Sequence, residues 1–274
     1  MEAYTGFANV YDEFMDNVPY DEWTEYLTDL LKEYGVENND LILDLGCGTG
    51  SMTRRLARKG FDMIGIDYSD DMLEIAREKG MEEGFSYDQI LYLNQDMREF
   101  ELYGTVAAVI SICDSMNYIT SSNDLKRVFE LVNNYLDSNG VFIFDMNTVH
   151  KYRDILGDTT IAENREDASF IWENYYNTEE KINQYDITIY KKVDLEFDDE
   201  DEEMPTSLFE RFEETHYQRA YEVEEIIKLI NEAGMEYVTA YDACTKNPPN
   251  ENSERVYFIA REKKQENKYY TDKR

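Results

Sequence analysis

Short apolar runs alternate with amphipathic segments between residues 41 and 145. The apolar runs have the β-branched and aromatic composition of buried strands, and the segments between them carry apolar residues at helical spacing. This alternation is typical of βαβ units on a parallel sheet. We predict strands over 41–45, 63–66, 90–93, 106–112 and 141–144, and helices over 51–59, from the Ser69 cap to Gly80, and over 123–135.

The pattern changes in the second half of the chain. From Tyr185 to Phe197 apolar and polar residues alternate with the period of a half-buried antiparallel strand. The acidic run 198–203 predicts a solvated turn, and the segment 208–219 predicts the returning strand. We therefore expect a small β-rich insertion over about residues 158–220.

The core pattern resumes after the insertion with an amphipathic helix from Val223 that stops at Gly234. Two further strands, 235–241 and 255–260, are joined directly enough to form an antiparallel hairpin at the sheet edge. The predicted fold class is α/β, with a Rossmann-like doubly wound sheet of seven strands, mostly parallel with an antiparallel last strand. The predicted organisation is a core over 1–157 and 221–262, a β insertion over 158–220, and a charged, frayed tail over 263–274.

Charge and composition limit the function. The chain carries 60 acidic against 27 basic residues, a net charge of −33, which repels phosphate backbones and anionic membrane surfaces. Three widely spaced cysteines and two histidines match neither a disulfide framework nor a zinc site, so we expect no metal. Since no apolar run is long enough for a membrane span and the first residues are acidic and aromatic, we expect a cytoplasmic protein without a membrane partner.

The most informative segment runs from Leu43 to Gly50 with the sequence LDLGCGTG. Glycines at a strand-to-helix turn let a ligand approach main-chain N–H groups closely. A dinucleotide fingerprint, G-x-G-x-x-G, needs its third glycine where this chain has Ser51. Asp44, just ahead of the first glycine, suits a cationic ligand end better than a pyrophosphate.

Four carboxylates, Asp44, Asp67, Asp96 and Asp114, fall at the carboxyl ends of the predicted strands. Ligands of open α/β sheets bind at this edge. Carboxylates converging there need a partner, and a sulfonium or an ammonium is a suitable one. For Asp114 a structural role is equally compatible with the sequence.

This ordered series of motifs resembles the class I S-adenosylmethionine-dependent methyltransferases. The resemblance implies that the three glycines wrap the methionine part of the cofactor, that Asp67 accepts hydrogen bonds from the ribose hydroxyls, and that Asp96 contacts the adenine amino group. It also implies that the run 113–118 forms the floor of the active site. The implied cofactor-binding residues are Tyr11, Tyr20, Trp23, Asp44, Gly46, Cys47, Gly48, Gly50, Asp67, Tyr68, Met72, Gln95, Asp96, Met97, Cys113 and Asp114.

Within this class the chain resembles a bacterial group of small-molecule-type methyltransferases with an N-terminal aromatic segment and a β insertion after strand five. The resemblance is carried by 4–12, 19–23, 144–148 and 172–175. Tyr4, Phe7 and Tyr11 fall at helical spacing, which is also compatible with a helix that simply packs on the core. The resemblance favours a helical lid over the cofactor, formed by residues 1–35.

In-line methyl transfer depends on positioning and electrostatics more than on covalent chemistry, although a nitrogen or oxygen acceptor can need a base. Related sugar-amine methyltransferases carry a histidine close to the position of Tyr118, and this chain does not. His216 is the strongest remaining base candidate, with a satisfied strand histidine as the alternative, and Tyr118 is the second catalytic candidate. Candidate acceptor contacts are Asn117, Asn147 and Arg219.

We therefore expect an S-adenosylmethionine-dependent methyltransferase that acts on a nitrogen or oxygen of a small-molecule acceptor and releases S-adenosylhomocysteine. A non-catalytic protein that binds either compound is the first alternative. A nicotinamide-dependent oxidoreductase is the second, and the spacing of the glycines and the Asp96–Met97 element argue against it. Nucleic acid is disfavoured as an acceptor by charge, while a basic protein stays open.

Overall fold

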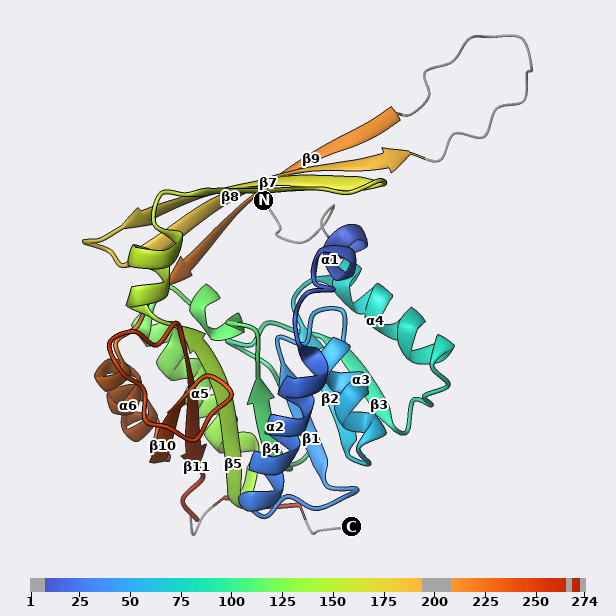
Figure 1. The fold of residues 1–274 in the computed structure, drawn as a ribbon. Coiled ribbons are helices and arrows are strands. Elements are labelled where there is room, and N and C mark those ends of the chain that lie inside the picture. The colour runs from blue at the N-terminus through green and yellow to red at the C-terminus, as the bar shows by residue number, and fades with distance from the viewer. Residues whose placement is uncertain (1–7, 194–207, 265–267, 272–274) are drawn as a thin grey trace.

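The computed structural model describes residues 8–193, 208–264 and 268–271 and contains two sheets (Figure 1). The large sheet has the strand order β10-β11-β5-β4-β1-β2-β3, with β1 to β5 parallel to one another and β11 antiparallel to β5 and β10. This confirms the predicted Rossmann-like sheet. Its strands are β1 (Leu41–Leu45), β2 (Asp62–Asp67), β3 (Ile90–Asn94), β4 (Val106–Ser111), β5 (Leu136–Asn147), β10 (Glu236–Asp242) and β11 (Arg255–Arg261).

Helices cover both faces of the large sheet because successive strand residues point to opposite sides. Ile42 and Val141 pack under the helices of one face, and Leu43 and Phe142, their chain neighbours, pack under those of the other. The first face carries α2 (Tyr20–Glu33) and α3 (Ser51–Arg58), and the second carries α5 (Ser122–Tyr135) and α6 (Val223–Glu232). The helices α1 (Ala8–Phe14) and α4 (Asp70–Glu82) lie at the β3 side of the molecule (Figure 1).

Two predicted boundaries in the core are wrong. Gly80 does not end the helix that follows Ser69, because α4 continues to Glu82 and Gly84 then adopts a φ of +83°. Gly80 instead lies inside the helix where it faces the ring of Tyr92. The fifth strand begins at Leu136 rather than at 141, and its register against β4 shifts between Leu136 and Val141.

The small sheet is antiparallel throughout, has the order β6-β7-β8-β9, and lies above the carboxyl ends of the parallel strands, next to α1 (Figure 1). Its strands are β6 (Thr160–Asn164), β7 (Ala168–Asn177), β8 (Ile182–Val193) and β9 (Leu208–Arg219). The returning strand matches its predicted bounds, whereas β8 starts three residues before the predicted Tyr185. The predicted acidic turn at 198–203 lies outside the described residues.

The inner face of the small sheet packs on α1. Val10 and Phe14 of α1 join a cluster with Ala168, Tyr185 and Ile187, and the Phe14 ring meets Phe170 edge-on at 4.8 Å. The N-terminal helix is therefore held between the two sheets. Of the predicted aromatic face, Tyr4 and Phe7 lie outside the described residues.

The tail is not frayed where the structure describes it. Lys268 Nζ donates to the carbonyl oxygens of Asn133 (2.5 Å) and Leu136 (2.6 Å), and lies 3.3 Å from a Glu262 carboxylate oxygen. These contacts satisfy carbonyl groups at the end of α5. None of the helices in the described part of the chain is both long and apolar enough to cross a membrane.

Candidate active site

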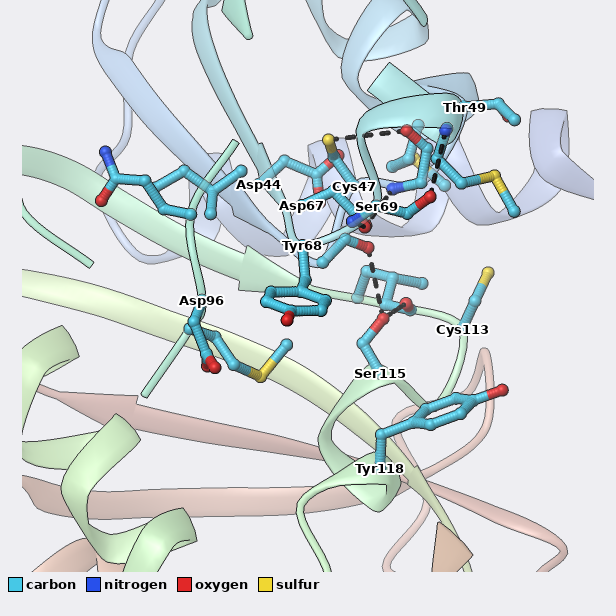
Figure 2. Close-up of a pocket in the computed structure, with 18 of the residues that line it drawn as sticks. Asp44, Cys47, Thr49, Asp67, Tyr68, Ser69, Asp96, Cys113, Ser115 and Tyr118 are labelled. Carbon is cyan, nitrogen blue, oxygen red and sulfur yellow. Dashed lines mark hydrogen bonds between the residues drawn. The ribbon is translucent and has the colours of Figure 1, made fainter. Parts of the chain in front are cut away.

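A cavity of about 350 Å³ opens at the carboxyl ends of β1 to β4 (Figure 2). Its walls come from α1, α2, the glycine turn after β1, the segments after β2 and β3, and the 3₁₀ helix η1 (Ser115–Tyr118). The volume suits a small molecule or cofactor. The expected cofactor-binding residues that line it are Tyr11, Tyr20, Asp44, Gly46, Cys47, Gly48, Asp67, Tyr68, Met72, Gln95, Asp96, Met97 and Cys113.

The glycine turn leaves room beside its main chain. Gly46, Gly48 and Gly50 have φ values of +82°, +53° and +72°, which side chains rarely adopt. A Cβ on Gly48 would meet no atom within 4 Å, whereas one on Gly46 would lie 2.8 Å from the Ser115 side chain. The space at Gly48 is available to a ligand that approaches the backbone.

Asp67 joins the glycine turn to the start of α4. Its carboxylate accepts hydrogen bonds from the main-chain N–H of Gly48 (2.8 Å) and of Ser69 (2.9 Å). Burial raises the pKa of Asp67. Because each carboxylate oxygen has a second lone pair, Asp67 can still accept from two ligand hydroxyls.

Asp44 supplies a second buried carboxylate at the glycine turn. It is 2% exposed and accepts a hydrogen bond of 2.6 Å from the Thr53 hydroxyl. Burial raises the pKa of Asp44 to about 7, with a further contribution from the charge of Asp67. A ligand cation at this position would favour the ionised form.

The opposite end of the cavity is formed by Asp96 and Tyr68 (Figure 2). The Arg98 side chain donates to Asp96 at 2.9 Å, and this hydrogen bond lowers the pKa of the Asp96 carboxyl. Met72 and Met97 also line the wall. A carboxylate beside aromatic and thioether side chains fits a purine with an exocyclic amine.

Three of the expected cofactor contacts lie outside the cavity lining. Trp23 lies over the Arg255 guanidinium, with 5.5 Å between its ring centroid and the central carbon. Asp114 pairs with Arg255 at 2.6 Å and accepts from the Gln218 amide at 2.6 Å. Gly50 caps the start of α3, where a Cβ would lie 2.3 Å from the Tyr92 hydroxyl oxygen.

The three expected acceptor contacts are engaged within the protein. Asn117 is fully buried and donates to the carbonyl oxygens of Asn147 (3.1 Å) and Arg219 (2.8 Å). Arg219 pairs with Glu225 at 2.9 Å and lies over the Tyr221 ring. These contacts join η1, β5 and β9, and the geometry gives no support to a substrate-binding role for the three residues.

The two catalytic candidates lie together. Tyr118 lines the cavity, and its hydroxyl oxygen is 3.4 Å from His216 Nδ1. His216 is 2% exposed and does not itself line the cavity.

Sequence reasoning missed Asp145 and Arg255, which support the cavity from behind. Asp145 accepts hydrogen bonds from the main-chain N–H of Cys113 (3.2 Å) and Asp114 (2.7 Å), and Arg255 pairs with Asp145 at 2.8 Å. Cys113 and Asp114 have φ values of +63° and +54°, so this network holds a strained turn beside the cavity. A carboxylate inside the apolar run 141–146 was the available signal, because a buried charge needs a partner.

The sheet, the glycine turn and the carboxylates after β2 and β3 define a class I methyltransferase fold with a nucleoside-type cofactor site. Residues 42–140 match a family model described as a methyltransferase domain. The chain is 36% identical over 262 residues to the methyltransferase-family protein YqeM of Bacillus subtilis (strain 168). The aligned region covers 95% of this chain and 98% of that protein.

Two further comparisons agree. A solved S-adenosylmethionine-dependent methyltransferase from Clostridium acetobutylicum matches with a TM-score of 0.80 and 28% identity, over 96% of this chain and all of that one (100%). A dTDP-3-amino-3,4,6-trideoxy-alpha-D-glucopyranose N,N-dimethyltransferase from Streptomyces venezuelae is 29% identical over 140 residues, 50% of this chain and 56% of that enzyme. The chain belongs to the S-adenosylmethionine-dependent methyltransferases, and S-adenosylmethionine is its cofactor.

Proposed function

We propose that this methyltransferase acts on a nitrogen or oxygen atom of a small-molecule acceptor. The observation that carries the proposal is the presence of three tyrosines, Tyr11, Tyr20 and Tyr118, among the residues that line the cavity. Burial raises the pKa of Tyr20, so its phenol stays protonated at neutral pH. Phenol oxygens and aromatic faces suit a polar or cationic acceptor.

Charge supports the same class of acceptor. Among the described residues that line the cavity, the one cation is Arg98, and it is bound to Asp96. The net charge of −33 disfavours a nucleic-acid acceptor. The Streptomyces venezuelae relative is named as an N,N-dimethyltransferase of an amino sugar nucleotide, which supports nitrogen.

The residues present fit the cofactor, which supplies the activated methyl group when bound. We assign Asp44, Gly46 and Gly48 to its methionine part, Asp67 to its ribose and Asp96 to its adenine. The other cavity-lining residues among those expected from the sequence complete the site. We also propose a cytoplasmic location, supported by the free thiols of Cys47, Cys113 and Cys244.

Calorimetric titration of the full chain tests the cofactor site. We expect S-adenosylmethionine and S-adenosylhomocysteine to bind, NAD not to bind, and Asp67→Ala to weaken binding by about 100-fold because charge-assisted hydrogen bonds are lost. Asp71→Ala, an exposed carboxylate in the first turn of α4, is the matched control.

Transfer of a radiolabelled methyl group to a panel of compounds tests the acceptor. The panel holds primary and secondary amines, alcohols, a basic peptide and tRNA. We expect label on small amines or alcohols. Preferential labelling of tRNA or the peptide would contradict the small-molecule proposal.

A further inference from the structure

A chain of buried polar side chains leads from the cavity wall into the small sheet. Tyr118 lines the cavity, and its hydroxyl oxygen lies 3.4 Å from His216 Nδ1. The other ring nitrogen of His216, Nε2, lies 3.2 Å from a carboxylate oxygen of Glu214. His216 and Glu214 are 2% and 7% exposed, so both contacts are shielded from water.

The alternation of β9 brings these groups to one face. Glu214 and His216 are buried, whereas the alternate residues Glu213 and Thr215 are exposed. His216 is paired in register with Tyr185 of β8, whose ring stacks on the imidazole with centroids 4.9 Å apart. Tyr185 also forms a hydrogen bond with Tyr118 through the two hydroxyl groups.

The Glu214 carboxylate lies where it can set which imidazole nitrogen carries the proton. An ionised carboxylate only accepts hydrogen bonds, so a neutral His216 beside it holds its proton on Nε2. Nδ1 then carries no proton and can accept a hydrogen bond, and it is the ring nitrogen nearer to Tyr118. The Tyr118 hydroxyl can donate to Nδ1 while its oxygen accepts from Tyr185. Among the residues that the structure describes, the titratable groups in contact with the ring include Tyr118 from η1, Tyr185 from β8 and Glu214 from β9.

We propose that Tyr118 and His216 form the proton-accepting relay of methyl transfer, with Glu214 as the positioning residue that sets the imidazole tautomer. The inference rests on the proposed nitrogen or oxygen acceptor, since such an atom has a proton to lose. Tyr118 is the catalytic group because it alone of the three reaches the cavity.

The proton moves in two coupled transfers. The acceptor gains its bond to the methyl carbon as the carbon–sulfur bond breaks, with the electron pair of that bond left on sulfur. The acceptor proton passes to the Tyr118 oxygen while the Tyr118 proton passes to His216 Nδ1. The positive charge, which the sulfonium carries at the start, is then on the His216 imidazolium, and the Glu214 carboxylate compensates it. The proton is released from His216 to solvent when the products leave. The 3.4 Å contact is long for a hydrogen bond, as is common for catalytic contacts without substrate.

NMR spectroscopy of the full chain with ¹⁵N-labelled imidazoles tests the tautomer without turnover. The chain has two histidines, so His150→Gln assigns both sets of resonances. We expect the His216 proton on Nε2, a shift of the Nδ1 resonance in Tyr118→Phe, and a gain of the Nδ1–H tautomer in Glu214→Gln. Glu213→Gln, on the exposed face of β9, is the matched control and leaves the His216 resonances unchanged. A proton on Nδ1 in the unmodified chain, or an Nδ1 resonance indifferent to Tyr118→Phe, overturns the relay.

Turnover with the compounds of the acceptor panel gives the second readout. We expect Tyr118→Phe and His216→Asn to lower kcat by about 10² to 10⁴-fold, while the Kd for S-adenosylhomocysteine changes by less than about threefold. Unchanged kcat in both variants overturns the relay. If the unmodified chain does not bind S-adenosylhomocysteine, or if no compound of the panel is methylated, the proposed function is refuted. The NMR result then decides on the relay by itself.

Discussion

The Asp12 carboxylate of α1 accepts a hydrogen bond of 2.7 Å from the Thr49 hydroxyl in the glycine turn. Lys79 of α4 pairs with the same carboxylate. Tyr11, the neighbour of Asp12, lines the cavity. The Asp12 carboxylate therefore links α1 to the glycine turn through Thr49 and to α4 through Lys79.

Removing this connection is expected to weaken cofactor binding. In Asp12→Ala, α1 loses its contacts with Thr49 and Lys79. We expect the Kd for S-adenosylhomocysteine to rise about tenfold, equivalent to the loss of about one charged hydrogen bond. Glu13→Ala changes an exposed carboxylate on the same helix and serves as the control in the same calorimetric titration. Equal affinities for the two variants would show that α1 does not support the site.

Two glycines of the turn are expected to separate binding from stability. Alanine at Gly48 meets no neighbouring atom, so Gly48→Ala should cost only about 1–2 kcal/mol of unfolding free energy from backbone strain. Its methyl group enters the space assigned to the ligand, and the cofactor Kd should rise at least about tenfold. Gly50→Ala adds a clash with Tyr92 and should cost about 1–3 kcal/mol more in urea unfolding. A larger stability loss for Gly48→Ala would contradict this assignment.

Cofactor affinity is expected to depend on pH through Asp44. In the free protein burial raises the pKa of Asp44 to about 7, so the carboxyl is mostly protonated at pH 6 and mostly ionised at pH 8. A cation at this site favours the carboxylate, so binding releases a proton and affinity falls as the pH drops below that pKa, by up to about tenfold per pH unit. Calorimetry in buffers of different ionisation enthalpy measures the released proton. Asp44→Asn should lose this part of the pH dependence, and its persistence there would exclude Asp44 as the source.

Arg255 is expected to stabilise the fold behind the cavity. It pairs with Asp145, which is fully buried, and with Asp114. Arg255→Met leaves the buried Asp145 carboxyl without its cation and should lower the free energy of unfolding by about 3–5 kcal/mol. Arg153→Met breaks an exposed pair with Asp154 and should change the same quantity by less than about 1 kcal/mol in urea unfolding at pH 7.5. Comparable losses in both variants would show that the buried network adds little.

Local order explains why much of the candidate site could be predicted from the sequence. Asp67 ends the parallel strand β2 and Asp96 follows the parallel strand β3. Any residue in such a position lies at the carboxyl edge of the sheet, whatever the rest of the chain does. The spacing of Gly46, Gly48 and Gly50 likewise marks one tight turn. These features depend on neighbours within a few residues.

Long-range pairing explains what the sequence did not show. Asp114 also follows a strand, but its carboxylate turns toward Arg255, which is 141 residues further along the chain. Trp23 packs on the same guanidinium, so neither residue lines the cavity. Strand β7 was not predicted because its sequence lacks a regular alternation of apolar and polar residues. Phe170 and Ile171 are neighbours in the chain and put apolar groups on both faces of the strand.

The pairing of β11 with β5 has a consequence for synthesis on the ribosome. The two strands pair from Val141 with Arg261 to Asn147 with Arg255, yet the whole small sheet and α6 lie between them in the chain. While the chain is being translated, β5 emerges long before β11 and presents an apolar edge without its neighbour. Unpaired edges of this kind recruit other chains. Nascent chains that stall within the small sheet are therefore the form of this protein most exposed to aggregation and most dependent on chaperones.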